Sequence, residues 1–154
     1  MKAKQFLTMV LLVAASSFIY SFVTPVGGEG FEIYLDNKLV LQQFNQEMKE
    51  KKNIQLTAAH SNSELKVKYY HCGMAGKSRT LELKNADQKT LKQWQFDNSE
   101  GKNFAIALAV KDILHSQEKL SNSTIYLYYS SKEAPQGRLL AGIVHAKKNT
   151  VTGR

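Results

Sequence analysis

The sequence ELKVKYYH, residues 64–71, alternates apolar and polar side chains along most of its length. A period of two is typical of a β-strand that buries one face, because successive side chains of a strand point to opposite sides. One face carries the residues expected to meet a core: Leu65, Val67, Tyr69 and His71. The other face carries Lys66, Lys68 and Tyr70. This stretch is the clearest element of the chain, and its neighbours follow the same pattern.

Short alternating runs separated by polar turn residues recur on both sides of this strand. Asp36 and Asn37 suit a hairpin turn because they tolerate turn backbone, and the polar stretch 45–53 indicates a loop or a solvated helical turn. Further strands are expected at 31–35, 39–44, 54–58, 79–84, 91–96, 104–110, 124–130 and 138–145. Roughly eight or nine short strands with turns about every ten residues predict an all-β fold, an antiparallel β-sandwich of immunoglobulin-like or other Greek-key type.

Residues 104–117 fit two structures. The stretch 104–110 is apolar on both faces, which is typical of a central strand covered on both sides. A helix over 106–117 competes, because Ile106, Val110 and Ile113 also fall on one helical stripe. We expect a strand followed by a short helical turn over 112–119, with the longer helix as the alternative.

The first 25 residues predict export. Lys2 and Lys4 precede a run without any charged residue, residues 6–23, which is the pattern of a signal peptide. The run is just long enough to span a bilayer, so an uncleaved anchor at the membrane is the alternative to a cleaved signal. A single β-sandwich domain is expected over 26–146, with a polar tail over 147–154.

The net charge is +8, and +6 without residues 1–25. A basic balance favours anionic partners such as lipid headgroups or acidic glycans, and it also promotes solubility. Nucleic acid is not expected as a partner, because the chain has no basic helix or RNA-binding motif and an exported protein meets little nucleic acid. Cys72, the only cysteine, is expected to be a small buried residue, with a free thiol or a link to another chain as alternatives.

The run HCGMAGKS, residues 71–78, contains most of the reactive groups that lie close together in the sequence. It is one residue short of a phosphate-binding P-loop, since His71 stands where the first glycine is required. A P-loop opens a helix, whereas residues 79–84 alternate like a strand. Nucleotide binding is therefore not expected.

The same run suggests copper. His71, Cys72 and Met74 place an imidazole, a thiol and a thioether within four residues, and these ligands suit copper in an exported protein. The first two side chains point to opposite faces if the strand continues, so one ion requires a backbone turn, which Gly73 permits. Other imidazoles that could complete the site are His60, His115 and His145. The competing interpretation is that His71 ends the strand while Cys72 packs in the core.

Tyrosines and lysines suggest a binding surface for a protein or glycan partner. The candidate residues are Tyr126, Tyr128, Lys132, Arg138, Lys66, Lys68 and Tyr70. Ordinary cross-strand packing of tyrosines is the alternative. No catalytic motif of the G-x-S-x-G, H-E-x-x-H or C-x-x-C type is present in the sequence, so no catalytic residues are predicted.

The runs YYHCGMAGKSRTLELK (69–84) and LYYSSKEAPQGRLLAGI (127–143) resemble segments of small exported β-rich proteins of Bacteroidota-type Gram-negative bacteria, which have no assigned activity. The resemblance implies residence in the periplasm or at the cell surface and transfers no functional residues. We predict a non-enzymatic exported binding or accessory module of the cell envelope, with no cofactor. A periplasmic copper-binding protein and a small secreted hydrolase are the alternatives.

Overall fold

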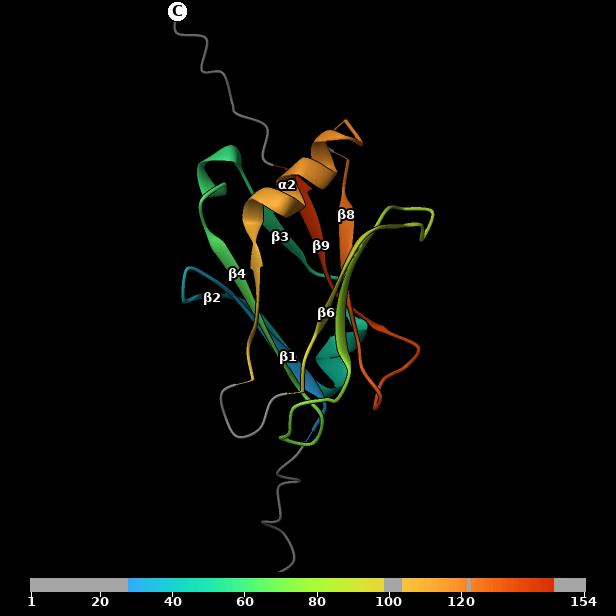
Figure 1. Ribbon diagram of the computed structural model, residues 1–154. Coiled ribbons are helices and arrows are strands. Elements are labelled where there is room, and N and C mark those ends of the chain that lie inside the picture. Colours follow the sequence, from blue (N-terminus) through green and yellow to red (C-terminus); the bar gives the residue numbers. More distant parts are fainter. Residues whose placement is uncertain (1–27, 99–103, 122, 146–154) are drawn as a thin grey trace, which may run out of the picture.

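The structure is a computed structural model that describes residues 28–98, 104–121 and 123–145. The signal segment expected over 1–25 and the tail expected over 147–154 lie outside these ranges. In the described part of the chain, nine strands form two sheets, and one α-helix lies at one end of them (Figure 1). No helix among these residues is long and apolar enough to cross a membrane.

The two sheets form the expected sandwich. Sheet A has the order β2 (Lys38–Phe44), β1 (Gly30–Leu35), β4 (Glu64–Tyr70) and β7 (Ile106–Ala109). Sheet B has the order β3 (Asn53–Leu56), β9 (Arg138–His145), β8 (Ile125–Ser130), β5 (Arg79–Lys84) and β6 (Thr90–Phe96). The helical segments are α2 (Val110–Glu118) and two short 3-10 turns, η2 (Asn45–Lys49) and η3 (Ala58–His60). The predicted all-β class is confirmed, and a turn of helix is present within 45–53.

Sheet B differs from the purely antiparallel sheet that was expected. Strand β3 runs parallel to β9, with Ile54 beside Ile143. A parallel neighbour requires a long connection, and here most of the chain lies between the two strands. The sequence pattern could not show this, because alternation within a strand does not depend on the direction of its neighbour.

The core lies between the sheets and is built from the inward side chains of alternating strands. Ile33 of β1 stands opposite Val67 of β4, and both are fully buried. Leu81 of β5 and Leu127 of β8 supply the facing layer from sheet B and are also fully buried. Burying an aliphatic side chain of this size stabilises a fold by about 1.5–3 kcal/mol, so this alternation is the main determinant of the sandwich.

The segment 104–119 is a strand followed by a helix, as expected. Strand β7 ends at Ala109, and α2 begins directly at Val110. Near the end of this helix, Gln117 donates from Nε2 to the Ile143 carbonyl of β9 at 2.9 Å. The expectation of a central strand covered on both sides is wrong. Strand β7 lies at the margin of sheet A, where Ala107 and Ala109 are exposed.

Three contacts made by side chains show which strands face each other across the core. The three contacts are Tyr69–Tyr129, Arg79–Phe104 and Glu29–Arg138. Tyr69 belongs to β4 and Tyr129 to β8. The second contact joins the start of β5 to the residues before β7, and the third joins the residue before β1 to the start of β9. Strands β1, β4 and β7 therefore face β9, β8 and β5.

Candidate functional site

A cluster of polar and aromatic side chains joins the sheets where β4 and β8 end. The rings of Tyr69 and Tyr129 are stacked, with centroids 4.2 Å apart and planes 7° from parallel. The Tyr69 hydroxyl donates to Oε1 of Glu29 at 2.5 Å. Arg138 donates to both oxygens of the same carboxylate, from Nε at 3.1 Å and from Nη2 at 3.3 Å.

The charges of this cluster are fixed at neutral pH. Partial burial raises the pKa of Glu29, but hydrogen bonds from Tyr69 and Arg138 and the charge of Arg138 outweigh it, so the net pKa lies below 4.5. Burial, followed by the hydrogen bond to Glu29, raises the pKa of Tyr69 far above 10. The phenol therefore stays a donor and the carboxylate an acceptor.

His71 adds an imidazole to the cluster. Its Nε2 lies 3.2 Å from the Tyr129 hydroxyl and 3.0 Å from Oγ of Ser131. Burial lowers the pKa of His71 below 6.5, although the negative charges of Glu133 and Glu29 oppose this shift. The ring is therefore neutral at pH 7.

The Ser131–His71 pair has the separation of a nucleophile and its base, but its surroundings differ from those of an activated serine. Oγ of Ser131 accepts hydrogen bonds from the amides of Glu133 and Ala134, both at 3.2 Å, and the residue is only 5 % exposed. In the described ranges no carboxylate hydrogen-bonds Nδ1 of His71. The hydrogen bond between the two side chains links the end of β8 to the end of β4. It gives no support to the hydrolase hypothesis.

Residues 71–74 form a tight turn. His71 and Met74 exchange both backbone hydrogen bonds, at 2.8 and 3.1 Å, and Cys72 and Gly73 between them have positive φ values of 52° and 83°. This is the backbone of a two-residue hairpin turn. The expectation that Cys72 packs in the core is wrong, because the turn places it on the surface, where its thiol is free and exposed.

The structure does not gather the predicted copper ligands around one point. Nε2 of His71 is directed at Tyr129 and Ser131, whereas Cys72 is exposed and Met74 is 68 % exposed. The other three histidines lie on η3, on α2 and at the end of β9: His60, His115 and His145. Among the residues that the structure describes, no group of three His, Cys, Asp or Glu side chains could hold a metal ion. Copper binding stays a prediction from the sequence.

The seven residues of the predicted binding surface lie in four places. Lys66, Lys68 and Tyr70 alternate outward on β4 of sheet A, and Tyr126 and Tyr128 alternate outward on β8 of sheet B. Arg138 belongs to the polar cluster, and Lys132 is exposed after the end of β8. The structure therefore contains no single surface that unites all seven.

The outer face of sheet A is organised around Glu32 of β1. The hydroxyls of Tyr34 and Tyr70 both donate to Oε2 of Glu32, at 2.7 and 2.8 Å. Burial, followed by this bond, raises the pKa of Tyr70 to about 12, so its phenol stays protonated. Nζ of Lys68 lies 5.4 Å from the centroid of the Tyr34 ring, within cation–π range. We call Glu32, Tyr34, Lys66, Lys68 and Tyr70 the tyrosine–lysine face.

A groove of about 370 Å³ opens on this face. It is lined by Tyr34, Asn37, Lys66, Lys68, Ala105 and Ala107. Ala107 stands opposite Lys66 in the pairing of β4 and β7, and its single methyl group leaves space beside the lysine. Nζ of Lys66 is held by Oδ1 of Asn37 at 2.8 Å and by Glu64 at 3.1 Å.

Sequence reasoning missed Glu32, Tyr34 and Asn37 as members of this site. The outward alternation of residues 32 and 34 could have placed the first two on a solvent face. It could not show that β1 pairs with β4, which brings Tyr34 opposite Lys66.

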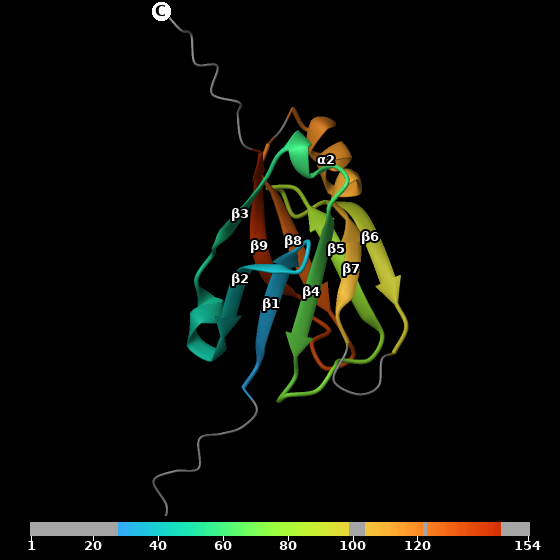
Figure 2. The ribbon, with the colours of Figure 1, turned by 90° about the vertical axis from the view of Figure 1, so that its left-hand side faces the viewer.

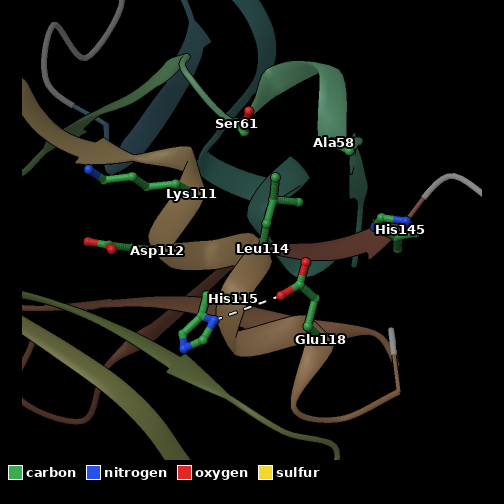
Figure 3. A pocket seen from close by; sticks show the side chains of 8 residues that line it. All are labelled: Ala58, Ser61, Lys111, Asp112, Leu114, His115, Glu118 and His145. Atoms are coloured by element: carbon green, nitrogen blue, oxygen red, sulfur yellow. Dashed lines mark ion pairs between the residues drawn. The ribbon is translucent and has the colours of Figure 1, made fainter.

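A larger groove, of about 470 Å³, lies beside α2. Figure 3 shows its lining, with His115 and Glu118 turned toward each other on α2 and His145 at the end of β9. Asp112 lies 3.1 Å from Nζ of Lys92, and Glu118 lies 3.8 Å from Nδ1 of His115. Apart from the two imidazoles, no aromatic ring lines this groove.

Comparisons with protein families, with curated proteins and with solved structures find no match to this chain. A function therefore has to be inferred from the described side chains. The tyrosine–lysine face differs from the α2 groove in one chemical respect. Its groove is lined by a phenol ring that Glu32 holds in place, whereas no phenol or indole ring lines the α2 groove.

Proposed function

We propose that the chain is a non-enzymatic binding module of the cell envelope and that its tyrosine–lysine face binds a glycan. The observation that carries the proposal is the groove on sheet A. A tyrosine ring held by Glu32 lines it, and Lys66 and Lys68 flank it. The net charge of +6 without residues 1–25 favours a glycan with acidic groups.

The chemistry of the groove suits a sugar. A sugar ring presents a face of C–H groups that stacks on an aromatic ring, and hydroxyls that need hydrogen-bonding partners at its edge. Because Glu32 fixes the Tyr34 and Tyr70 hydroxyls, the rings are ordered before a ligand arrives, which lowers the entropic cost of binding. Lys66 and Lys68 supply charged donors beside the ring.

A protein partner fits this groove less well. Protein interfaces are usually centred on large apolar or aromatic anchors in well-packed pockets. In the described part of the chain, the exposed large apolar side chains are Leu39, Val40 and Met74, and none of them lines the groove. The polar lining therefore favours a hydrated ligand.

Residence in the envelope rests on the first 25 residues. Mass spectrometry of the protein from its own cells should show a mature start between about residues 17 and 28, as signal cleavage behind the apolar run requires. An intact Met1 in the membrane fraction would instead establish an anchored protein that presents the same domain at the membrane surface.

Glycan binding is tested with an array of bacterial envelope polysaccharides, followed by calorimetry on the best ligand. Tyr34→Ala and Lys68→Ala should each weaken binding about tenfold, which corresponds to about 1.4 kcal/mol. Tyr126→Ala is the matched control, since this tyrosine is also half-buried but lies on the outer face of sheet B. Absence of any ligand at millimolar affinity contradicts the proposal, and so does a loss confined to Tyr126→Ala.

A further inference from the structure

Strand β6 has no strand facing it across the core among the described residues. Across the core, β1 faces β9, β4 faces β8 and β7 faces β5. Sheet B therefore extends one strand beyond sheet A at this margin. Figure 2 shows β6 and β7 at the same margin of the sandwich. Trp94 and Phe96 of β6 stand opposite Leu81 and Arg79 and point inward with them. Both pack against the core but stay only partly buried.

The neighbouring edge of β7 has unpaired backbone groups. The amide of Val110 donates to the Ser63 carbonyl at 3.0 Å, which makes this pair a hydrogen-bonded position of the β4–β7 ladder. Hydrogen-bonded and non-bonded positions alternate in antiparallel strands, so Ala109 and Ala107 direct N–H and C=O away from β4. Within the described ranges no backbone group pairs with them on that side.

The β7 edge is short, at four residues, but it carries none of the other features that protect a sheet margin, such as charged side chains, proline or a bulge. Strand β2 carries Lys38 and pairs through a bulge beside Tyr34. Strand β6 carries Lys92 and pairs through a bulge beside Lys84. Strand β7 has no charge, no proline and a regular register with β4. Strand β7 therefore has the composition of an interior strand of a sheet, although β4 is the one strand that pairs with it in the described ranges.

We propose that the margin formed by β7 and β6 is a slot for one extended peptide segment of a partner protein. The segment pairs with the free edge of β7 and lays alternate apolar side chains on Trp94 and Phe96, as in recognition by strand addition. One additional strand would bring sheet A to the width of sheet B. The slot shares Ala107 with the groove on the tyrosine–lysine face but uses other groups: the backbone edge of β7 and the inner face of β6, whereas the groove is lined by outward side chains of sheet A.

The ends of the slot limit the length and the charge of the segment. At one end, Nζ of Lys92 lies 3.1 Å from Asp112 of α2 and 5.1 Å from the Trp94 ring. At the other end, the Arg79 guanidinium donates to the carbonyls of Asp97 and Phe104, both at 2.7 Å. Between these charged ends the inward side chains of β6 are Trp94 and Phe96, so the peptide needs uncharged residues at its centre.

A second copy of β7 does not fit the slot. Symmetric pairing of two β7 strands would continue sheet A into the partner copy. Because β5 lies across the core from β7, the β5 strand of that copy would then fall where β6 already stands. A single extended segment meets no such obstacle.

The chain offers a built-in probe, since Trp94 is its only tryptophan. The ligand is a synthetic peptide of alternating valine and threonine, flanked by lysines for solubility, titrated into the purified full-length protein. We expect a saturable blue shift of the Trp94 emission as the added strand covers the ring. Ala107→Pro should abolish the shift, because it removes the outward N–H without breaking the ladder to β4. Ala107→Ser, which keeps the N–H, should retain it.

The same peptide with alternate backbone nitrogens methylated is the control on the unchanged protein, because it keeps the side chains and cannot pair. No shift of Trp94 at saturating peptide overturns the proposal, and an equal shift with the methylated peptide does the same. A blue shift that grows with protein concentration alone would show that a second copy is the occupant and would also overturn it. Lys68→Ala should leave peptide binding unchanged, which separates this slot from the glycan site.

Discussion

Replacing Tyr69 with phenylalanine tests whether the polar cluster holds the two sheets together. The change removes only the hydroxyl, which donates to Glu29 at 2.5 Å, and leaves the ring stacked on Tyr129. Glu29 then keeps Arg138 as its remaining donor. The fold is expected to lose the free energy of one charged hydrogen bond and little packing.

The size of this loss follows from the exposure of the partners. A hydrogen bond to a charged group contributes about 1.5–3 kcal/mol when it is well shielded. Tyr69 is buried, but the Glu29 side chain is 34 % exposed, so water replaces part of the lost bond. We expect Tyr69→Phe to lower the free energy of unfolding by about 1–2 kcal/mol, or the melting temperature by about 4–8 °C.

Urea unfolding followed by circular dichroism measures the change, in a cycle with Glu29→Ala and the double variant. Tyr69→Phe should cost much less in the Glu29→Ala background, because its acceptor is already gone. The control is Tyr126→Phe, whose hydroxyl bonds no group in the described ranges and whose loss should be nearly silent. Full additivity of Tyr69→Phe and Glu29→Ala would refute the reasoning, as would a Tyr69→Phe effect no larger than that of the control.

The remaining predictions concern the core, the β6–β7 connection and pH. Val67→Ala should lower the free energy of unfolding by about 1–3 kcal/mol, because this side chain is fully buried, and Lys68→Ala should lower it by less than about 0.5 kcal/mol. Equal losses in urea unfolding would mean that the faces of β4 are assigned wrongly. Arg79→Lys should lower the free energy of unfolding by about 2 kcal/mol, because one ammonium cannot replace the two guanidinium nitrogens that donate to the Asp97 and Phe104 carbonyls. Unchanged stability in urea would contradict the role of Arg79 as a link between these carbonyls. The pKa of His71 lies below 6.5 in the folded protein, so the unfolded chain binds a proton at this residue more readily. The free energy of unfolding should therefore fall as the pH drops below 6.5 toward the folded-state pKa. His71→Gln should flatten the slope of urea midpoints between about pH 7.5 and 5.5, while the lowered pKa of Glu29 acts only below 4.5; an unchanged slope would show that His71 is not the titrating group.

Local alternation was enough to predict the strands. Leu65 and Val67 were expected to face the core and are buried, because a strand with one buried face has to repeat its side chains with period two. Strand β8 shows the same alternation, since Ile125, Leu127 and Tyr129 are buried while Tyr126 and Tyr128 are only partly buried. These results depend only on residues that are close together in the sequence.

Properties that depend on the partner of a strand were not accessible. The stretch 104–110 was expected to be a central strand because it is apolar on both faces, yet the order of sheet A puts β7 at the margin. Cys72 was expected in the core because it is small and apolar, but the hairpin turn needs positive φ at this position and turns the side chain outward. The polar cluster was missed because Glu29 and Arg138 meet only after both sheets have formed.

The central claim is that the tyrosine–lysine face binds a glycan, and an NMR titration tests it most directly. ¹⁵N-labelled protein is titrated with the oligosaccharide selected on the array, and the shifts of the backbone amides are mapped onto the structure. The account predicts that the largest shifts lie along the groove, at Tyr34, Lys66, Lys68 and Ala107. Largest shifts at Tyr126 and Tyr128 of sheet B, or around His115 and His145 beside α2, would contradict it.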